Sequence, residues 1–251
     1  MFNVRLFGAA VVSGLFLASC GGGGGSPAPS PAPTTSAEGL YLGTTNTNRT
    51  VTGLVLDDGT FYVLYSLVGN PSVIGGVVQG SGVSNNGSFS SSNALDFNLE
   101  GLGVLAATVS ASYTSRQSLN GIVLYNGGGS TSFTSVFDVA YDTVPSLSTL
   151  AGIFSGQVAF SQGVENANVT VSPSGALSGV GASGCTVTGS VVPRTRGNVF
   201  NLSLTFGGAP CFFANQTMTG IAYFDAPAKR LYGATPTANR ADGVLFVGVK
   251  P

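Results

Sequence analysis

Short runs in which apolar and polar residues alternate with a period of two recur along most of this chain. Residues 95–100 and 200–206 are clear examples. A period of two places successive side chains on opposite faces of a strand, so each run predicts a half-buried antiparallel strand with one face toward solvent. In the first run, the face expected to be wet carries Asp96, Asn98 and Glu100. No long window shows helical periodicity, and the chain is therefore predicted to be all-β.

Turn-forming residues separate these runs, and glycine alone accounts for 38 of the 251 residues. Glycine and asparagine adopt the positive φ values that tight hairpins need. The expected turns are Asp57-Asp58-Gly59, Asn86-Gly87, Asn120-Gly121, Asn126-Gly127 and Ser174-Gly175. Strands joined in this way form an antiparallel meander of hairpins.

Three segments of the chain resemble later segments in the same order, which indicates an internal repeat. The pairs are Gly39–Gly43 with Gly152–Gly156, Phe97–Leu99 with Phe200–Leu202, and Gln117–Asn126 with Gln216–Asp225. The repeat predicts two tandem units, 38–146 and 147–251, each a small β-barrel; a sandwich is the alternative architecture. Residues 142–148 are then expected to be an exposed connection with few contacts crossing it.

The amino terminus carries the features of an export signal. Arg5 is followed by an apolar run from Leu6 to Leu17 and then by Ala18, Ser19 and Cys20. This run is too short to span a bilayer, which needs roughly 20 residues. An ordinary secretory signal with a chance cysteine is one interpretation of this segment.

Leu17-Ala18-Ser19-Cys20 also resembles the lipobox of bacterial lipoproteins. The resemblance implies a signal peptide over 1–19, cleavage before Cys20, and attachment of fatty acids such as palmitate to that cysteine. Gly21, where an Asp would retain a lipoprotein at the inner membrane, favours an outer-membrane location. The membrane is thus an expected partner through the lipid anchor. Residues 20–37 are rich in Gly and Pro and are expected to be a disordered tether.

Cys185 and Cys211 are the remaining cysteines of the chain. An exported protein reaches an oxidising compartment, so this even pair predicts a disulfide, with an expected stabilisation of about 3 kcal/mol.

Composition restricts the chemistry that the chain can perform. It has no His, which removes the commonest acid-base and nucleophile systems and His-ligated zinc. With 9 basic and 10 acidic residues, it lacks the positive charge of a nucleic-acid-binding protein. No cofactor or metal site is predicted, because neither a phosphate loop nor a calcium loop occurs.

Charged residues outside the strands are interpreted as loop residues. Asp57 and Asp58 are adjacent and therefore point apart, which favours a hairpin turn over a catalytic pair. Arg194, Arg196 and the pair Lys229-Arg230 are expected to be solvated loop charges.

Leu231-Tyr232-Gly233 and residues 238–246 resemble the closing strands of the barrels in surface lipoproteins of the transferrin-binding protein B and factor H-binding protein type. This chain has Ala234 where that family has Pro, and Arg240 where it has Glu. The resemblance implies an eight-stranded barrel on a lipid tether, and carries over no ligand contacts.

Together these features predict an outer-membrane lipoprotein that acts as a binding or interaction module without catalysis. The ligand stays open between a protein and a small molecule. One alternative is a structural lipoprotein that maintains the envelope. Another is a hydrolase that uses carboxylates such as Asp96, Glu100 or Asp225.

Overall fold

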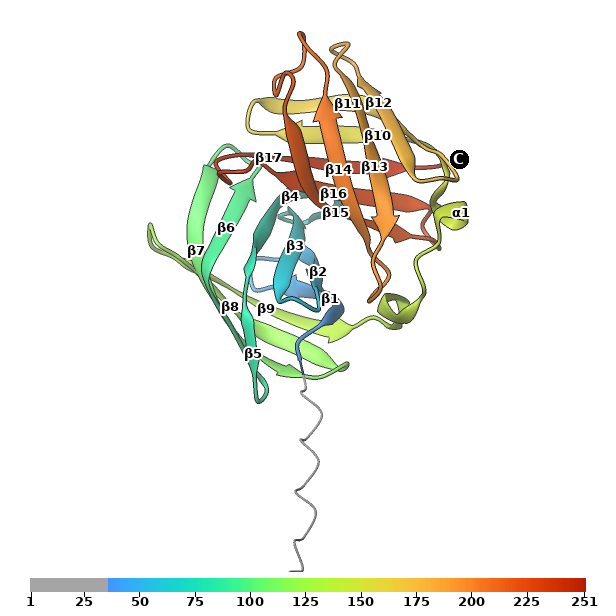
Figure 1. Cartoon of the computed structure of the whole chain (residues 1–251). Helices are drawn as coiled ribbons and strands as arrows, with labels where there is room; N and C mark the ends of the chain where they lie inside the picture. Colours follow the sequence, from blue (N-terminus) through green and yellow to red (C-terminus); the bar gives the residue numbers. More distant parts are fainter. Residues whose placement is uncertain (1–35) are drawn as a thin grey trace, which may run out of the picture. The chain divides into compact units, whose positions relative to one another are not determined.

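The computed structural model describes residues 36–251, and these form two antiparallel β-barrels in tandem (Figure 1). The predicted signal peptide, Cys20 and most of the predicted tether lie outside the described residues. The all-β prediction is confirmed. Among residues 36–251, the helices found are one turn each: the 3₁₀ helix η1 (Val139–Asp142) and α1 (Leu147–Leu150).

The first barrel is built from strands of the first half of the described chain. These strands are β1 (Gly39–Thr45), β2 (Thr50–Val55), β3 (Thr60–Leu67), β4 (Asn70–Ser81), β5 (Val83–Asn85), β6 (Ser88–Asn98), β7 (Gly103–Thr114), β8 (Ser118–Tyr125) and β9 (Ser130–Phe137). The sheet order is β4-β3-β2-β1-β9-β8-β7-β6-β5, and an additional pairing of β4 with β6 closes the ring. The short strand β5 pairs with β6 at the start of the latter.

The second barrel closes with all its strands in sequence order. They are β10 (Gly152–Phe160), β11 (Gly163–Val171), β12 (Ala176–Gly181), β13 (Thr186–Pro193), β14 (Phe200–Phe206), β15 (Thr217–Asp225), β16 (Arg230–Pro236) and β17 (Gly243–Val249). The segment with the family resemblance forms the β16–β17 hairpin, and β17 closes the ring by pairing with β10.

Both barrels close over a glycine in their first strand. A Cβ at Gly43 would lie 2.0 Å from the carbonyl oxygen of Thr134 in β9, and a Cβ at Gly156 would lie 2.1 Å from that of Val247 in β17. Only glycine leaves room for the last strand at this distance. The sequence similarity between Gly39–Gly43 and Gly152–Gly156 therefore marks equivalent positions in the two barrels.

The other two internal similarities do not mark equivalent positions. Phe97 and Phe200 both lie on the fifth strand of their ring, but Phe97 packs outside its barrel and Phe200 inside. The segment after Gln117 forms the seventh strand of the first ring, whereas the one after Gln216 forms the sixth strand of the second.

Most of the predicted turns are found. Gly59, Gly87 and Gly175 all have positive φ at hairpin turns. Asn120-Gly121, however, lies inside β8 and not in a turn. A Cβ at Gly121 would be 2.4 Å from the carbonyl oxygen of Ser110, so this glycine permits close strand approach.

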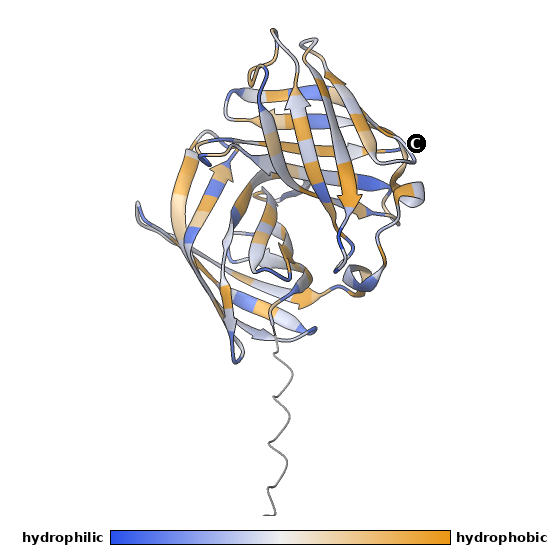
Figure 2. Cartoon of the chain, in the orientation of Figure 1, coloured by the Kyte–Doolittle hydropathy of each residue, from blue (hydrophilic) through white to orange (hydrophobic). Residues whose placement is uncertain are grey.

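Alternation along the strands is visible as bands of opposite hydropathy (Figure 2). In β14 it follows the prediction, because Phe200, Leu202, Leu204 and Phe206 fill the second barrel. In β6 the predicted faces are reversed. Asp96 points into the first barrel and is only 2% exposed, whereas Phe97 belongs to an apolar cluster on the outside of that barrel.

That outer cluster joins the two barrels. It combines the outward-facing side chains of the first barrel with those of β15, β16 and β17. Its buried members include Leu54, Tyr62, Leu64 and Phe97 from the first barrel, and Ile221, Tyr223, Ala234 and Leu245 from the second. The expectation of few contacts across residues 142–148 is therefore wrong, and residues 36–251 belong to one compact unit.

Arginines of the second barrel extend this contact. The interpretation as a solvated loop charge is wrong for Arg194, whose side chain is 18% exposed, whereas the side chain of Arg196 is 62% exposed, as expected for a solvated loop residue. Arg194 forms an ion pair with Asp57 (2.5 Å), and Arg196 pairs with Glu38 (2.5 Å). Arg240 donates from Nε to the side-chain oxygen of Gln79 (2.9 Å) and from Nη2 to its carbonyl oxygen (2.8 Å).

The predicted disulfide between Cys185 and Cys211 is present. It ties the connection between β14 and β15 to the end of β12 and the start of β13. Among residues 36–251, no helix has the length and apolar character to cross a membrane.

Candidate ligand site in the first barrel

The first barrel is hollow at one end. Its interior holds a cavity of about 470 Å³. The deep part is lined by apolar side chains such as Val55, Phe61, Val78 and Phe89, which are buried. The opposite part reaches exposed residues of the β1–β2, β6–β7 and β8–β9 connections, including Thr47, Leu102 and Gly127. The cavity therefore opens at the end of the barrel where these connections lie.

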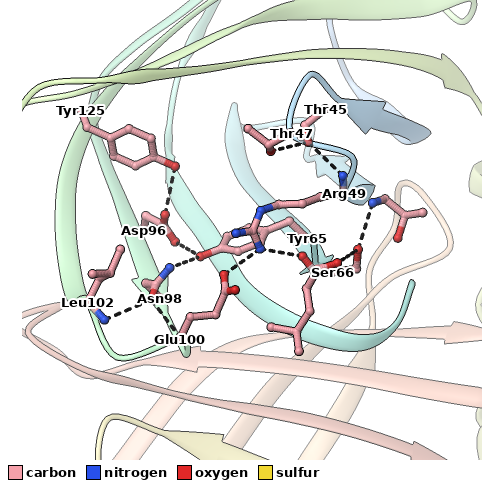
Figure 3. A network of polar contacts seen from close by, with 12 residues as sticks. Thr45, Thr47, Arg49, Tyr65, Ser66, Asp96, Asn98, Glu100, Leu102 and Tyr125 are labelled. Atoms are coloured by element: carbon pink, nitrogen blue, oxygen red, sulfur yellow. Dashed lines mark hydrogen bonds and ion pairs between the residues drawn. The ribbon is translucent and has the colours of Figure 1, made fainter. Parts of the chain in front are cut away.

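Asp96 is the buried charged group of this cavity (Figure 3). Its carboxylate accepts hydrogen bonds from two phenols on other strands. Tyr65 of β3 donates to Oδ1 at 2.7 Å, and Tyr125 of β8 donates to Oδ2 at 3.1 Å. A carboxylate away from water is tolerated only when it is hydrogen-bonded, and the two tyrosines supply those bonds.

Tyr65 reaches Asp96 by crossing a glycine. A Cβ at Gly76 would lie 2.3 Å from the Tyr65 hydroxyl oxygen, so any larger residue there would displace the phenol. Asn98, two residues after Asp96 and on the same face of β6, donates to the Tyr65 hydroxyl at 3.1 Å. Three strands thus position the phenol: β3 carries Tyr65, Gly76 of β4 leaves space for its ring, and Asn98 of β6 donates to its hydroxyl oxygen.

A second charged pair lies beside this group. Arg49 and Glu100 form an ion pair at 2.6 Å, with side-chain exposures of 19% and 28%. The Arg49 guanidinium also donates to the carbonyl oxygen of Ser66 at 2.8 Å and lies 5.3 Å from the centre of the Tyr65 ring. Arg49 is therefore held by several partners at the open end of the cavity.

Burial changes the acidity of these groups. It raises the pKa of the Asp96 carboxyl, and the hydrogen bonds from Tyr65 and Tyr125 oppose that rise. Burial and the neighbouring Asp96 charge raise the pKa of Tyr125 to about 12 and also raise that of Tyr65. Both phenols are therefore protonated donors at neutral pH.

Of the carboxylates considered for hydrolysis, Asp96 and Glu100 belong to the same polar network, whereas Asp225 lies in β15 of the second barrel. Asp57 and Asp58 lie in the β2–β3 turn as predicted. Residues 36–251 contain no group of three or more acidic or cysteine residues that could hold a metal ion.

The sequence did not single out Tyr65, Tyr125 or Arg49 as site residues. A signal was present in β3, where Tyr62 and Leu64 alternate with Phe61, Val63 and Tyr65 and both faces are apolar. A strand that is apolar on both faces is covered on both sides. This pattern indicates a second layer packed against β3, but it does not specify which face of β6 points inward.

The second barrel has a smaller cavity, of about 310 Å³, at the topologically equivalent end. Its lining is mostly apolar, and the connection between β14 and β15 contributes Phe212 and the buried Phe213. Phe212 is 52% exposed and stacks on Phe160 with ring centres 5.5 Å apart. Glu165, which lines the same cavity, accepts a hydrogen bond from the backbone N–H of Ser183 at 2.7 Å.

Comparison with known proteins identifies no family for this chain. No protein-family model matches the sequence, and no curated protein matches it. Among solved structures, it is similar to isotype 1 transferrin-binding protein B from serogroup B Neisseria meningitidis, with 11% identity and a TM-score of 0.32. The match covers 81% of this chain and 66% of that one.

A hemagglutinin from Myxococcus xanthus, solved in complex with a3,a6-mannopentaose, is similar over 84% of this chain and 92% of its own, with 14% identity and a TM-score of 0.19. At these values neither similarity assigns a ligand or a role. The functional argument therefore depends on the cavity itself.

Proposed function

We propose that this protein is a lipid-anchored outer-membrane lipoprotein whose first barrel binds a small ligand, without catalysis. The cavity of about 470 Å³ carries the proposal. Ligand sites commonly enclose roughly 300–1,000 Å³, with mostly apolar walls and a few polar groups that fix orientation. The lining of this cavity has that composition. The cavity opens among loops, where the binding residues of proteins are often found.

The lipid anchor is supported by the sequence of the export signal and its Cys20. Fatty-acid labelling of the wild type and of Cys20→Ala tests this part. The wild type should be labelled and should fractionate with the outer membrane, whereas Cys20→Ala should do neither. Labelling of Cys20→Ala, or an unlabelled wild type, would refute the anchor.

Absence of catalysis is supported by the way the carboxylates are engaged. Asp96 is bonded by two phenols and Glu100 by Arg49. Neither is presented as a free acid or base across a common space, which paired-carboxylate hydrolysis requires. Turnover of any glycoside that Asp96→Asn abolishes would contradict this part of the proposal.

A variant that fills the cavity tests ligand binding. Gly53 lines the cavity, and a Cβ there would have its nearest contact at 3.7 Å, so Gly53→Phe places a ring in the open space. Octan-1-ol, a neutral probe with an apolar body, should bind the wild type saturably in calorimetry, and Gly53→Phe should remove that site. Val144→Phe is the matched control because Val144 is 82% exposed. Binding that Gly53→Phe leaves unchanged would place the ligand elsewhere.

A further inference from the structure

The charges inside the first barrel do not balance. The charged side chains of the polar network are Arg49, Asp96 and Glu100 (Figure 3). Arg49 pairs with Glu100 at 2.6 Å, and within residues 36–251 Asp96 forms no ion pair. When ionised, the network therefore carries one excess negative charge, located on a carboxylate that is 2% exposed. The hydrogen bonds from Tyr65 and Tyr125 offset part of the cost of burying this charge, and an accompanying opposite charge would offset more of it.

The hydrogen-bonding groups around Asp96 also favour a ligand that donates hydrogen bonds. Tyr65 and Tyr125 each use their proton to donate to Asp96, which leaves the phenol oxygens as acceptors. The Tyr65 oxygen already accepts from Asn98, and the Tyr125 hydroxyl has a hydrogen bond with Thr131. A group that enters beside Asp96 therefore meets carboxylate and phenol oxygens, and it is complementary to them if it donates.

Two aromatic side chains contact this position. Tyr65 and Tyr125 both line the cavity and both bond Asp96. The faces of such rings attract cations within about 6 Å of the centroid. The Arg49 guanidinium, 5.3 Å from the centre of the Tyr65 ring, already makes this contact.

We propose that the ligand of the first barrel is an organic cation: an ammonium group that lies against Asp96 and the rings of Tyr65 and Tyr125, carried on an apolar body that packs deeper among Val55, Phe61 and Phe89. This inference rests on the proposed function, because it names the class of ligand for the same cavity. The ammonium supplies the positive charge and the donors that the cavity lacks. The apolar body matches the walls.

The acidity of Asp96 is consistent with this assignment. Burial raises the pKa of Asp96, and a bound cation would favour its ionised form. The charged and titratable groups that face Asp96 are Tyr65 from β3, Tyr125 from β8, Arg49 before β2 and Glu100 after β6. Affinity for the cation should therefore increase as pH rises through the Asp96 pKa, whereas affinity for a neutral ligand should not.

Three probes with the same eight-carbon body test the inference: octylammonium, octan-1-ol and octanoate. Calorimetry on the whole protein should show octylammonium binding at least about tenfold more tightly than octan-1-ol at the site that Gly53→Phe removes, which corresponds to about 1.4 kcal/mol. Octanoate should bind most weakly.

Variants separate the role of Asp96 from its structural contribution. Asp96→Asn should abolish the preference for octylammonium while octan-1-ol binding stays within about threefold. Arg49→Gln, which removes the nearby cation, should increase the preference. Asp225→Asn, a carboxylate substitution in the second barrel, is the matched control and should leave it unchanged. If Asp96→Asn does not fold, the pH dependence of binding to the wild type decides the same question, because affinity for octylammonium should increase as pH rises through the Asp96 pKa whereas affinity for octan-1-ol should not.

The outcomes distinguish the inference from the proposed function. If octan-1-ol binds but octylammonium binds no better, or octanoate binds best, the cationic ligand is wrong and the binding cavity stands. If none of the three probes binds, both the inference and the small-ligand function are wrong.

Discussion

The two barrels share a strand plan and a closing device but differ in what fills them. Each ring has eight antiparallel strands, and each closes over a first-strand glycine, Gly43 or Gly156. The first barrel places Asp96 and two phenols in its interior, whereas the second is filled mainly by Phe and Leu and has a disulfide at its open end. The comparison shows that ring closure depends on backbone proximity, which leaves the interior free to differ.

The largest effect is expected when the two barrels are forced apart, and cutting the connection between them tests whether they separate on their own. A protease site inserted after Val144 would cut the exposed connection without touching a strand. The halves should stay together on size-exclusion chromatography, because the cluster around Tyr62 and Tyr223 would otherwise be exposed to water. The same halves should separate only in denaturant. Fragments that elute apart and melt cooperatively would show that the barrels are independent after all.

Closure can be disrupted at the same position in each barrel. Gly43→Val and Gly156→Val should each lower the free energy of unfolding by about 3 kcal/mol or more, since the new side chain meets a strand backbone that cannot move aside easily. Urea unfolding measures the effect. Gly53→Ala is the control, because a Cβ there makes only ordinary contacts, and it should cost about 1 kcal/mol at most. Two tolerated Val variants would refute the shared closing device.

The disulfide should stabilise the second barrel and not the first. The Cys185→Ser, Cys211→Ser double variant should lose about 3 kcal/mol, as expected for a bridge across 26 residues. Hydrogen exchange should rise mainly in β12 to β15 and leave β1 to β9 unchanged. Equal loss of protection from hydrogen exchange in both barrels would contradict this prediction. It would mean that the destabilisation caused by removing the disulfide passes to the first barrel through the contact between the barrels.

The smallest effect concerns the buried carboxylate of the first barrel. Because the pKa of Asp96 is raised in the folded state, the folded protein binds this proton more tightly than the unfolded chain does. Asp96 therefore lowers stability as pH rises from the ordinary carboxyl range through its raised pKa. The free energy of unfolding of the wild type, minus that of Asp96→Asn, should fall over that range and then level off.

Tyr125→Phe sharpens this measurement. It removes a hydrogen bond that favours the ionised form of Asp96, so the fall should extend to higher pH. Urea unfolding at several pH values tests both variants. A difference between wild type and Asp96→Asn that increases with pH would mean that the pKa is lowered instead.

Local patterns in the sequence predicted the strands, most hairpin turns and the cysteine pair, because each depends on neighbouring residues or on composition. They did not predict which face of β6 points inward. The alternation of Asp96 with Leu95 and Phe97 is identical whichever side is buried, and only the packing of the second barrel against Phe97 decides it. The site was missed for the same reason, since Tyr65, Asp96 and Tyr125 meet only after the ring closes.

The chain enters the first barrel at one end, and the cavity opens at the other. Ala37 is buried, and its N–H donates to Ser84 Oγ at 2.9 Å, at the end where β1 begins. The cavity opens at the other end of β1, beside Thr45 and Thr47. The described chain therefore enters the first barrel at the end opposite to the cavity opening, so a ligand can approach the opening without passing the residues where the chain enters.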